Sequence, residues 1–236
     1  SRSSPELDSM SATAPPPPRV DKSGGRVRQM FGEIAGRYDL LNHVLSLGVD
    51  VYWRWRTVRT IVPESSGPIL DVCTGTGDLA LAFRERAPRS VAVVGSDFTH
   101  EMLVLAREKS GTAGAEDARS VARPGSIASA GRGVVTFIEA DAQALPFADN
   151  AFQIVSVAFG LRNVADTRRG LREMTRVCRP AGRVAVLEFS QPAWPGLKPL
   201  YDVYSFAVLP RLGRLVAKDE ASYRYLAESI RKHPDQ

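Results

Sequence analysis

The sequence has few cysteines and no apolar run long enough to span a membrane. Its 236 residues include two cysteines, Cys73 and Cys178, which do not form a Cys-x-x-Cys pair. This pattern excludes a disulfide framework and the usual zinc site, so we expect no bound metal and a reducing compartment. No apolar run approaches the ~18 residues that cross a bilayer, and the N-terminus lacks the apolar core of a secretory signal. We therefore expect a cytoplasmic protein.

The charge is modestly positive and spread along the chain. There are 31 lysines and arginines against 26 aspartates and glutamates, which gives a formal net charge of +5. The basic residues are scattered rather than clustered, which argues against a nucleic-acid partner. With 44% hydrophobic and 24% charged residues, the composition is that of one globular domain.

Two low-complexity stretches accompany this domain. Residues 1–25, which contain "APPPP" and "KSGG", have no aromatic residue and predict a disordered tail. Residues 110–133 are rich in Gly, Ala and Ser and predict a mobile insertion, because ordered loops of this length are uncommon. The domain itself is expected to span residues 26–236.

Short apolar runs alternate with helical patterns through the rest of the chain. The expected strands cover 68–72, 91–97, 134–141, 152–159 and 183–189. The expected helices cover 78–87, 99–109 and 166–178. This alternation predicts a doubly wound α/β fold with a mostly parallel sheet covered on both faces. Residues 26–61 predict an N-terminal helical lid, and no convincing strand follows residue 189.

A glycine-rich turn joins the first expected strand to its helix. In "DVCTGTGDLA", Gly75 and Gly77 permit close approach of the backbone to a ligand. Gly75-x-Gly77-x-x-Ala80 satisfies the dinucleotide-binding pattern, and Asp97 lies about 20 residues further on. The turn by itself therefore also permits an NAD-linked oxidoreductase.

Three acids at the ends of expected strands favour a cationic nucleoside over a pyrophosphate. Asp71, Asp97 and Asp141 should meet at the carboxyl edge of the sheet, and Asp71 beside the glycines would attract a cation. S-adenosylmethionine (SAM) suits this edge. Asp97 can accept from its ribose hydroxyl groups and Asp141 from its adenine amino group, with backbone contacts from Ala142. The alternative is that each acid only caps its strand.

Several longer motifs are more specific than the glycine turn. They are "YDLLNHVLSLGVDVYW" (38–53), "ALPF" (144–147), "FGLRN" (159–163), "RVCRPAGRVAVLEFS" (176–190) and "SYRYLAESIRKHPDQ" (222–236). Together they resemble the C-methyltransferases of menaquinone and ubiquinone biosynthesis, from about Val27 to the last residue. In the first motif the family has methionine at Leu41 and histidine at Asp50.

The resemblance implies a class I fold and transfer of a methyl group from SAM to a ring carbon of a polyprenyl hydroquinone. The family's SAM contacts fall on Thr76, Asp97, Asp141 and Ala142, and its strand-end serine is replaced by Ala158. A class I sheet has two strands after the fifth, which this chain is expected to lack. The acceptor is expected to be a demethylmenaquinol rather than the equivalent ubiquinone precursor.

The resemblance also assigns a role to the end of the fourth expected strand. Methylation at carbon requires the quinol to lose a hydroxyl proton, so we expect Arg162 to steady the phenolate or hold a water that takes the proton. Asn163 would orient the hydroxyl group, and Tyr38 would close the site. The alternative is a helix-entry turn in which Asn163 or Asp166 caps the next helix.

The polyprenyl substrate implies contact with a membrane surface. "VYWRWR" (51–56) and "LPRLGRLVAK" (209–218) place arginines beside apolar residues, so each is a candidate for this contact or for a packed helix face. A second copy of the chain, in a homodimer, is a further candidate partner. A SAM-binding subunit without activity is the non-enzymatic alternative, whereas the lack of an Asn-Pro-Pro-aromatic motif argues against nucleic-acid methylation.

Overall fold

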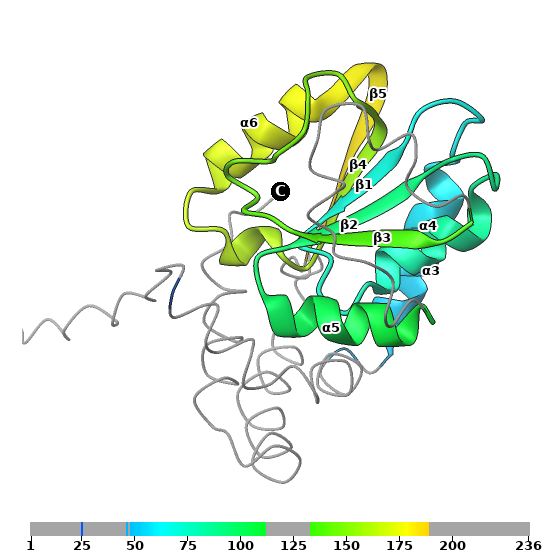
Figure 1. The fold of residues 1–236 in the computed structure, drawn as a ribbon, viewed down its shortest axis with the longest axis horizontal. Coiled ribbons are helices and arrows are strands. Elements are labelled where there is room, and N and C mark those ends of the chain that lie inside the picture. Colours follow the sequence, from blue (N-terminus) through cyan, green and yellow to red (C-terminus); the bar gives the residue numbers. More distant parts are fainter. Residues whose placement is uncertain (1–24, 26–45, 47, 112–132, 189–236) are drawn as a thin grey trace, which may run out of the picture.

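The chain forms a parallel sheet covered by helices on both faces, as predicted (Figure 1). The computed structural model describes residues 25, 46, 48–111 and 133–188. The strands are β1 (Ile69–Val72), β2 (Val93–Asp97), β3 (Val135–Glu139), β4 (Phe152–Ala158) and β5 (Cys178–Leu187). The helices are α3 (Val49–Thr60), α4 (Asp78–Arg86), α5 (His100–Lys109), the 3-10 helix η4 (Leu161–Asn163) and α6 (Thr167–Val177). The strands lie in the order β3-β2-β1-β4-β5, which places β1 at the centre.

Some predicted segments lie outside the described residues. These are the tail up to residue 24, most of the N-terminal lid, most of the 110–133 insertion and all residues after 188. The predicted lack of two further strands concerns the last of these segments. Within the described part of the chain, no helix is long and apolar enough to cross a membrane.

Side-chain alternation along β1 separates two cores. Leu70 and Val72 belong to the core under α6, together with Met174. Ile69 belongs to the core on the opposite face. Figure 1 shows α6 on one side of the sheet and α3, α4 and α5 on the other. Asp71 shares the face of Ile69, so its carboxylate points toward the layer of α3 and α4.

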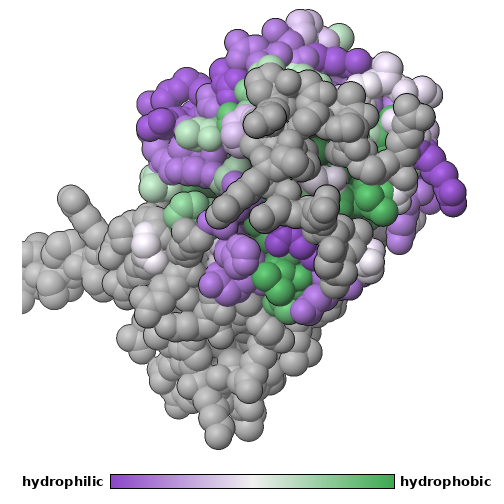
Figure 2. Space-filling model, viewed as in Figure 1, coloured by the Kyte–Doolittle hydropathy of each residue, from purple (hydrophilic) through white to green (hydrophobic). Residues whose placement is uncertain are grey.

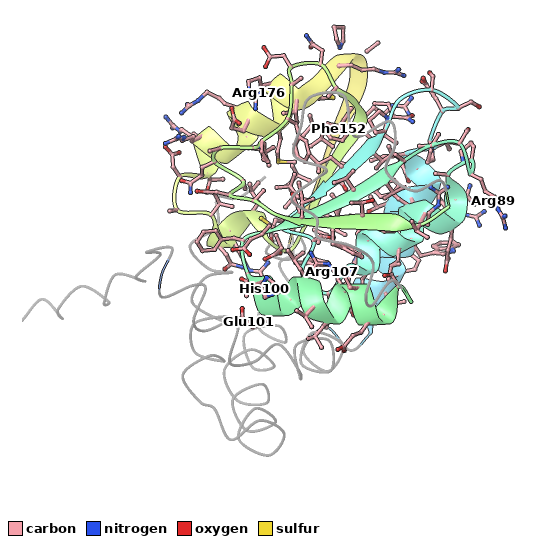
Figure 3. The ribbon with its side chains drawn as sticks, viewed as in Figure 1. Arg89, His100, Glu101, Arg107, Phe152 and Arg176 are labelled. Carbon is pink, nitrogen blue, oxygen red and sulfur yellow. The ribbon has the colours of Figure 1, made fainter. Side chains whose placement is uncertain are left out.

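Arginines of α5 and α6 bond to backbone carbonyls beneath these helices. The outward face of α6 is hydrophilic (Figure 2), as expected for an amphipathic helix packed on a sheet. Figure 3 shows Arg107 between α5 and β3, where it donates to the carbonyl of Phe137 over 3.1 Å. Arg176 of α6 donates to the carbonyls of Leu145 and Phe147 over 2.9 and 2.8 Å. The bond of Arg107 fastens α5 to β3, and those of Arg176 fasten α6 to the loop between β3 and β4.

The fifth strand begins five residues earlier than predicted. Cys178, expected to end a helix, already pairs with Phe152 in β5. The register then shifts so that Arg183 lies opposite Ile154, and Ala181 between these pairs has a φ of 60°. Such an irregularity interrupts the apolar pattern from which the strand was predicted, which explains the difference.

Two helices begin at a left-handed glycine, but only one of these glycines packs against the sheet. Gly77 precedes α4 with a φ of 87°, and a Cβ there would lie 2.9 Å from the ring of Phe137. Gly48 precedes α3 with a φ of 77°, and no atom lies within 4 Å of the position of its Cβ. Gly77 is therefore required by both its backbone and its neighbour.

Gly77→Ala is expected to lower the free energy of unfolding by about 3 kcal/mol, because left-handed strain adds to an overlap with Phe137. Gly48→Ala, the matched control, carries the strain alone and should cost about 1 kcal/mol. Urea unfolding of both variants and the parent chain measures the difference. Equal losses would contradict a role for the contact between α4 and Phe137.

Candidate functional site

The three acids predicted at the carboxyl edge do gather there. Their charges act together on the thiol of Cys73, which follows β1. The carboxylates around this thiol belong to Asp71, Asp97, Asp141 and Glu188. Burial, and then these charges, raise the pKa of the Cys73 thiol, so that it stays protonated. The edge around the turn after β1 is therefore negative.

Asp71 lies inside the fold rather than at the mouth of the site. It is 1% exposed, opposite Ser156 of β4 and Gly95 of β2. Ser156 donates to its Oδ1 over 2.7 Å, and Thr74 donates to its Oδ2 over 2.6 Å. Burial raises the pKa of Asp71 to about 6, although both hydroxyl groups and the charge of Arg54 oppose the rise. The carboxylate of Asp71 is therefore linked to the glycine turn through the hydroxyl group of Thr74.

Asp97 connects the turns after β1 and β2. Its Oδ2 accepts from the N–H of Gly75 and its Oδ1 from the N–H of Thr99, each over 2.8 Å. Burial raises the pKa of Asp97, and these N–H groups oppose the rise. A carboxylate oxygen can accept a second hydrogen bond. Asp97 can therefore bind ribose hydroxyl groups while it holds the glycine turn.

Asp141 begins a tight turn after β3. Its Oδ1 accepts from the N–H of Gln143 over 2.8 Å, and its carbonyl accepts from the N–H of Ala144 over 3.0 Å. Ala142, between them, is buried in the core under α6. The turn fixes the carboxylate of Asp141 at the same edge as Asp97.

The glycine turn adopts the conformation that its sequence favours. Gly75 and Gly77 have φ angles of 57° and 87°, in the left-handed region. Thr76 between them is buried, and its hydroxyl accepts from Nζ of Lys109 over 3.1 Å. Lys109 also forms an ion pair with Asp78 at 2.6 Å. The end of α5 is thus fastened to the start of α4 beside the turn.

The turn after β4 packs directly on the glycine turn. A Cβ at Gly160 would overlap the side chain of Cys73, so only glycine permits the contact. Phe159 and Cys73 have φ angles of 58° and 52°. Residues other than glycine rarely adopt this backbone, and such residues cluster at functional sites. Ala158, immediately before this turn, pairs with Leu187 of β5.

Arg162 is buried beneath the turn after β4. It is 2% exposed, its Nη1 lies 2.8 Å from Oε2 of Glu188, and it also donates to the carbonyl of Phe159. Its backbone N–H donates to the other oxygen of Glu188 over 3.2 Å. The pair fastens η4 to the residue after β5. Glu188 was not among the predicted residues, although an acid next to an apolar strand is the signal that identified Asp97.

The other catalytic candidates have different placements. Asn163 ends η4, where its backbone N–H donates to the carbonyl of Gly160 over 3.0 Å. Asp166 caps α6 by accepting from the N–H of Arg169 over 2.9 Å, which confirms the helix-entry turn as a structural feature. Tyr38 lies outside the described residues.

Helix α3 contributes a cation from the motif "VYWRWR" that was not predicted to lie at the site. Nη1 of Arg54 lies 2.6 Å from Oδ2 of Asp50 and 3.3 Å from Oδ2 of Asp78. Its guanidinium carbon lies 5.5 Å from the ring centre of Phe159. Arg54 therefore joins α3, the start of α4 and the turn after β4 at one point.

Comparison with known proteins identifies the family. The ubiE/COQ5 methyltransferase family matches residues 19–236. The chain belongs to this family. The ubiquinone/menaquinone biosynthesis C-methyltransferase UbiE of Hahella chejuensis is 43% identical over 92% of this chain and 81% of its own length. That of Cronobacter sakazakii is 42% identical over 92% of this chain and 80% of its own length.

Family membership confirms the predicted resemblance and identifies the chain as a SAM-dependent C-methyltransferase. It does not support the NAD-linked oxidoreductase or the inactive subunit. The glycine turn, which left the first alternative open, belongs here to a methyltransferase fold.

Solved structures of methyltransferases share this fold. A SAM-dependent methyltransferase from Thermotoga maritima, described as a possible histamine N-methyltransferase, has a TM-score of 0.53 at 17% identity and covers 78% of this chain and 70% of that chain. A putative SAM-dependent methyltransferase from Methanococcus maripaludis has a TM-score of 0.50 at 12% identity, with coverages of 93% and 88%. At these identities the likeness shows the fold alone, and it confirms the class I architecture.

The described residues fit SAM. Asp97 has acceptor capacity for ribose hydroxyl groups, and the carboxylates around Cys73 suit the positive sulfonium and ammonium groups. Gly75 and Gly77 have no side chain to obstruct a ligand that approaches the backbone. The fit therefore rests on the charge of the edge and on the backbone of the turn.

Asp71→Asn is expected to change how stability depends on pH. The folded pKa of about 6 exceeds the ordinary 3.8. The folded chain thus binds the proton more tightly than the unfolded chain, and the free energy of unfolding falls as pH rises through this window. The variant lacks this ionisation, so its stability relative to the parent should rise by about 2 kcal/mol between about pH 4 and pH 7.

Urea unfolding at both pH values measures this change. Asp149→Asn, which removes a carboxylate that is 69% exposed, is the control for the loss of a surface charge. A stability difference between Asp71→Asn and the parent that does not vary with pH would contradict the raised pKa.

Proposed function

We propose that the chain transfers the methyl group of SAM to a ring carbon of a polyprenyl hydroquinone, with a demethylmenaquinol as the acceptor. Family membership supports the reaction type, and the relatives are named for both ubiquinone and menaquinone biosynthesis. The observation that carries the proposal to this chain is the negative edge around Cys73, where the turns after β1 and β4 pack together.

Five positions are assigned to the methyl donor. Asp97 would accept from the ribose hydroxyl groups, and Asp141 from the adenine amino group beside the backbone of Ala142. Thr76 would contact it from the glycine turn, and Ala158 from the end of β4. When bound, SAM supplies an electrophilic methyl group on a sulfonium, so the chain needs no covalent nucleophile.

The acceptor becomes nucleophilic at carbon when its hydroxyl group loses a proton. The buried pair between Arg162 and Glu188 supports a positioning role for Arg162, because it fixes η4 and thereby Asn163. Because Glu188 neutralises the charge of Arg162, this positioning role replaces direct contact of Arg162 with the phenolate. Asn163 would orient that group, and Tyr38 would close the site. Because a polyprenyl tail lies in a bilayer, the chain is proposed to act at a membrane surface on the cytoplasmic side.

Transfer of labelled methyl from SAM to a chemically reduced, short-tailed demethylmenaquinol tests this proposal. A methoxy-benzoquinol in a parallel reaction is the competing acceptor, and we expect a higher kcat/KM for demethylmenaquinol. Asp97→Asn should weaken SAM affinity about 10- to 100-fold, because a charged acceptor of hydroxyl hydrogen bonds is lost. Asp149→Asn is again the control. A chain that binds SAM but methylates neither acceptor would overturn the proposed function.

Arg162→Ala is expected to lower kcat at least about 10-fold while SAM affinity changes less than about 2-fold, because the acceptor side of the site loses its support. Removal of one partner of a buried ion pair also costs about 3–5 kcal/mol of stability, so turnover is measured well below the unfolding temperature. Arg162→Lys keeps a positive charge beside Glu188 and should recover part of kcat. Unchanged kcat in the alanine variant would exclude the positioning role.

A further inference from the structure

The polarity of helix α3 is reversed relative to an ordinary surface helix. Its inward face carries Asp50, Arg54 and Val58 at four-residue spacing, with Asp50 1% exposed and paired to Arg54. Its outward face carries large apolar side chains. Among the described residues, six of the ten exposed large hydrophobic side chains lie between Val49 and Val62. A helix that only covered the sheet would show the opposite arrangement.

The exposed side chains of α3 form an aromatic cluster. Tyr52, Trp53 and Trp55 are 50%, 46% and 49% exposed. The ring centre of Tyr52 lies 5.4 Å from that of Trp53 and 5.9 Å from that of Trp55. We call Tyr52, Trp53 and Trp55, with the neighbouring Arg56 and Arg59, the aromatic face of α3. Rings of this kind favour the boundary between an apolar phase and water, because one end is apolar and the other polar.

The charge on the aromatic face is positive. Arg56 and Arg59 are both exposed, and the guanidinium of Arg59 lies 4.7 Å from the ring centre of Trp55. The only acid in α3 is Asp50, which is turned inward to Arg54. The face therefore combines aromatic rings with arginines and has no carboxylate of its own helix. A negative and partly apolar surface complements it.

We propose that the aromatic face of α3 docks on the surface of an anionic phospholipid bilayer. The inference rests on the proposed function in one respect, since a polyprenyl acceptor must be drawn from lipid. A second copy of the chain is a poorer occupant, because a symmetric interface would oppose Arg56 and Arg59 to their own copies. With 12 residues, α3 is too short to span a bilayer and suits the headgroup boundary.

The position of α3 links this face to the site. From its inward face, Arg54 reaches Asp78 at the start of α4 and the ring of Phe159 in the turn after β4. Both contacts lie at the carboxyl edge where the acids gather. A bilayer on the outward face would therefore lie one helix thickness from the site. The acceptor ring could enter at the edge while its tail remains in lipid.

Flotation with lipid vesicles tests the docking. The full chain should bind vesicles of phosphatidylcholine with 30% phosphatidylglycerol and should not bind phosphatidylcholine alone, at about 0.1 M salt. Two of the three tryptophans of the chain lie on α3, so binding should also shift tryptophan emission to shorter wavelength. Binding to neither vesicle, or equal binding to both, would overturn the proposal.

Paired substitutions locate the surface. Arg56→Gln/Arg59→Gln and Tyr52→Ser/Trp55→Ser should each weaken vesicle binding at least about 10-fold. Arg168→Gln/Arg172→Gln, which removes the same charge from exposed positions on α6, is the matched control and should retain most of the binding. An equal loss in the control would overturn the assignment to α3. The same conclusion would follow if Tyr52→Ser/Trp55→Ser only dissociated a dimer in sedimentation and left vesicle binding intact.

Turnover separates the docking from the proposed function. With a short-tailed, water-soluble quinol and no vesicles, both α3 variants should keep the kcat of the parent. With a long-tailed quinol in anionic vesicles, both should lose most of their turnover while the α6 control does not. Vesicle binding by a parent chain that transfers no methyl group would leave the docking standing and overturn the function. Normal methylation without vesicle binding would leave the proposed function standing and overturn the docking.

Discussion

Asp71 keeps a carboxyl group almost wholly buried in the central strand, where burial raises its pKa to about 6. The two oxygens accept from Ser156 of the neighbouring strand and from Thr74 of the glycine turn. Because Ser156 lies opposite Asp71 and Gly95 flanks it on the other strand, a one-residue shift in register would remove a donor. The position of the glycine turn, and with it the bond from Gly75 to Asp97, depends on this arrangement.

The acids at the edge are an electrostatic cost to the folded chain and an attraction for a positive ligand. Four carboxylates surround the thiol of Cys73, which burial and these charges keep neutral. Arg54 reduces the shift at Asp71, and Arg162 pairs with Glu188. A cationic ligand at this edge would relieve part of the remaining repulsion. Its binding should therefore favour the folded chain as well as the site, since both depend on the same charges.

Local patterns in the sequence predicted the glycine turn and the three acids, because each lies at the end of an apolar run. Contacts that depend on the pairing of distant strands were not predictable. Ser156 lies 85 residues from Asp71, and Glu188 lies 26 residues from Arg162. Neither pairing follows from spacing, since each is created by the order of the strands in the sheet. The early start of β5 was missed for a related reason, because an irregular register hides its first residues from a periodic pattern.

Helix α3 contacts the edge of the sheet with one face and exposes aromatic rings on the other. A buried ion pair contributes little net stability, so the pair of Asp50 and Arg54 is better explained by the contacts that it fixes than by the energy that it adds. Arg54 must lie on the inward face to reach Asp78 and Phe159, which leaves the aromatic face of α3 turned away from the sheet. Rings exposed in this way are unfavourable in water unless something covers them. The ring of the proposed acceptor reacts at the edge of the sheet while its tail stays in lipid. A helix with one face toward this edge and the other on the bilayer would keep the two within the thickness of a single helix.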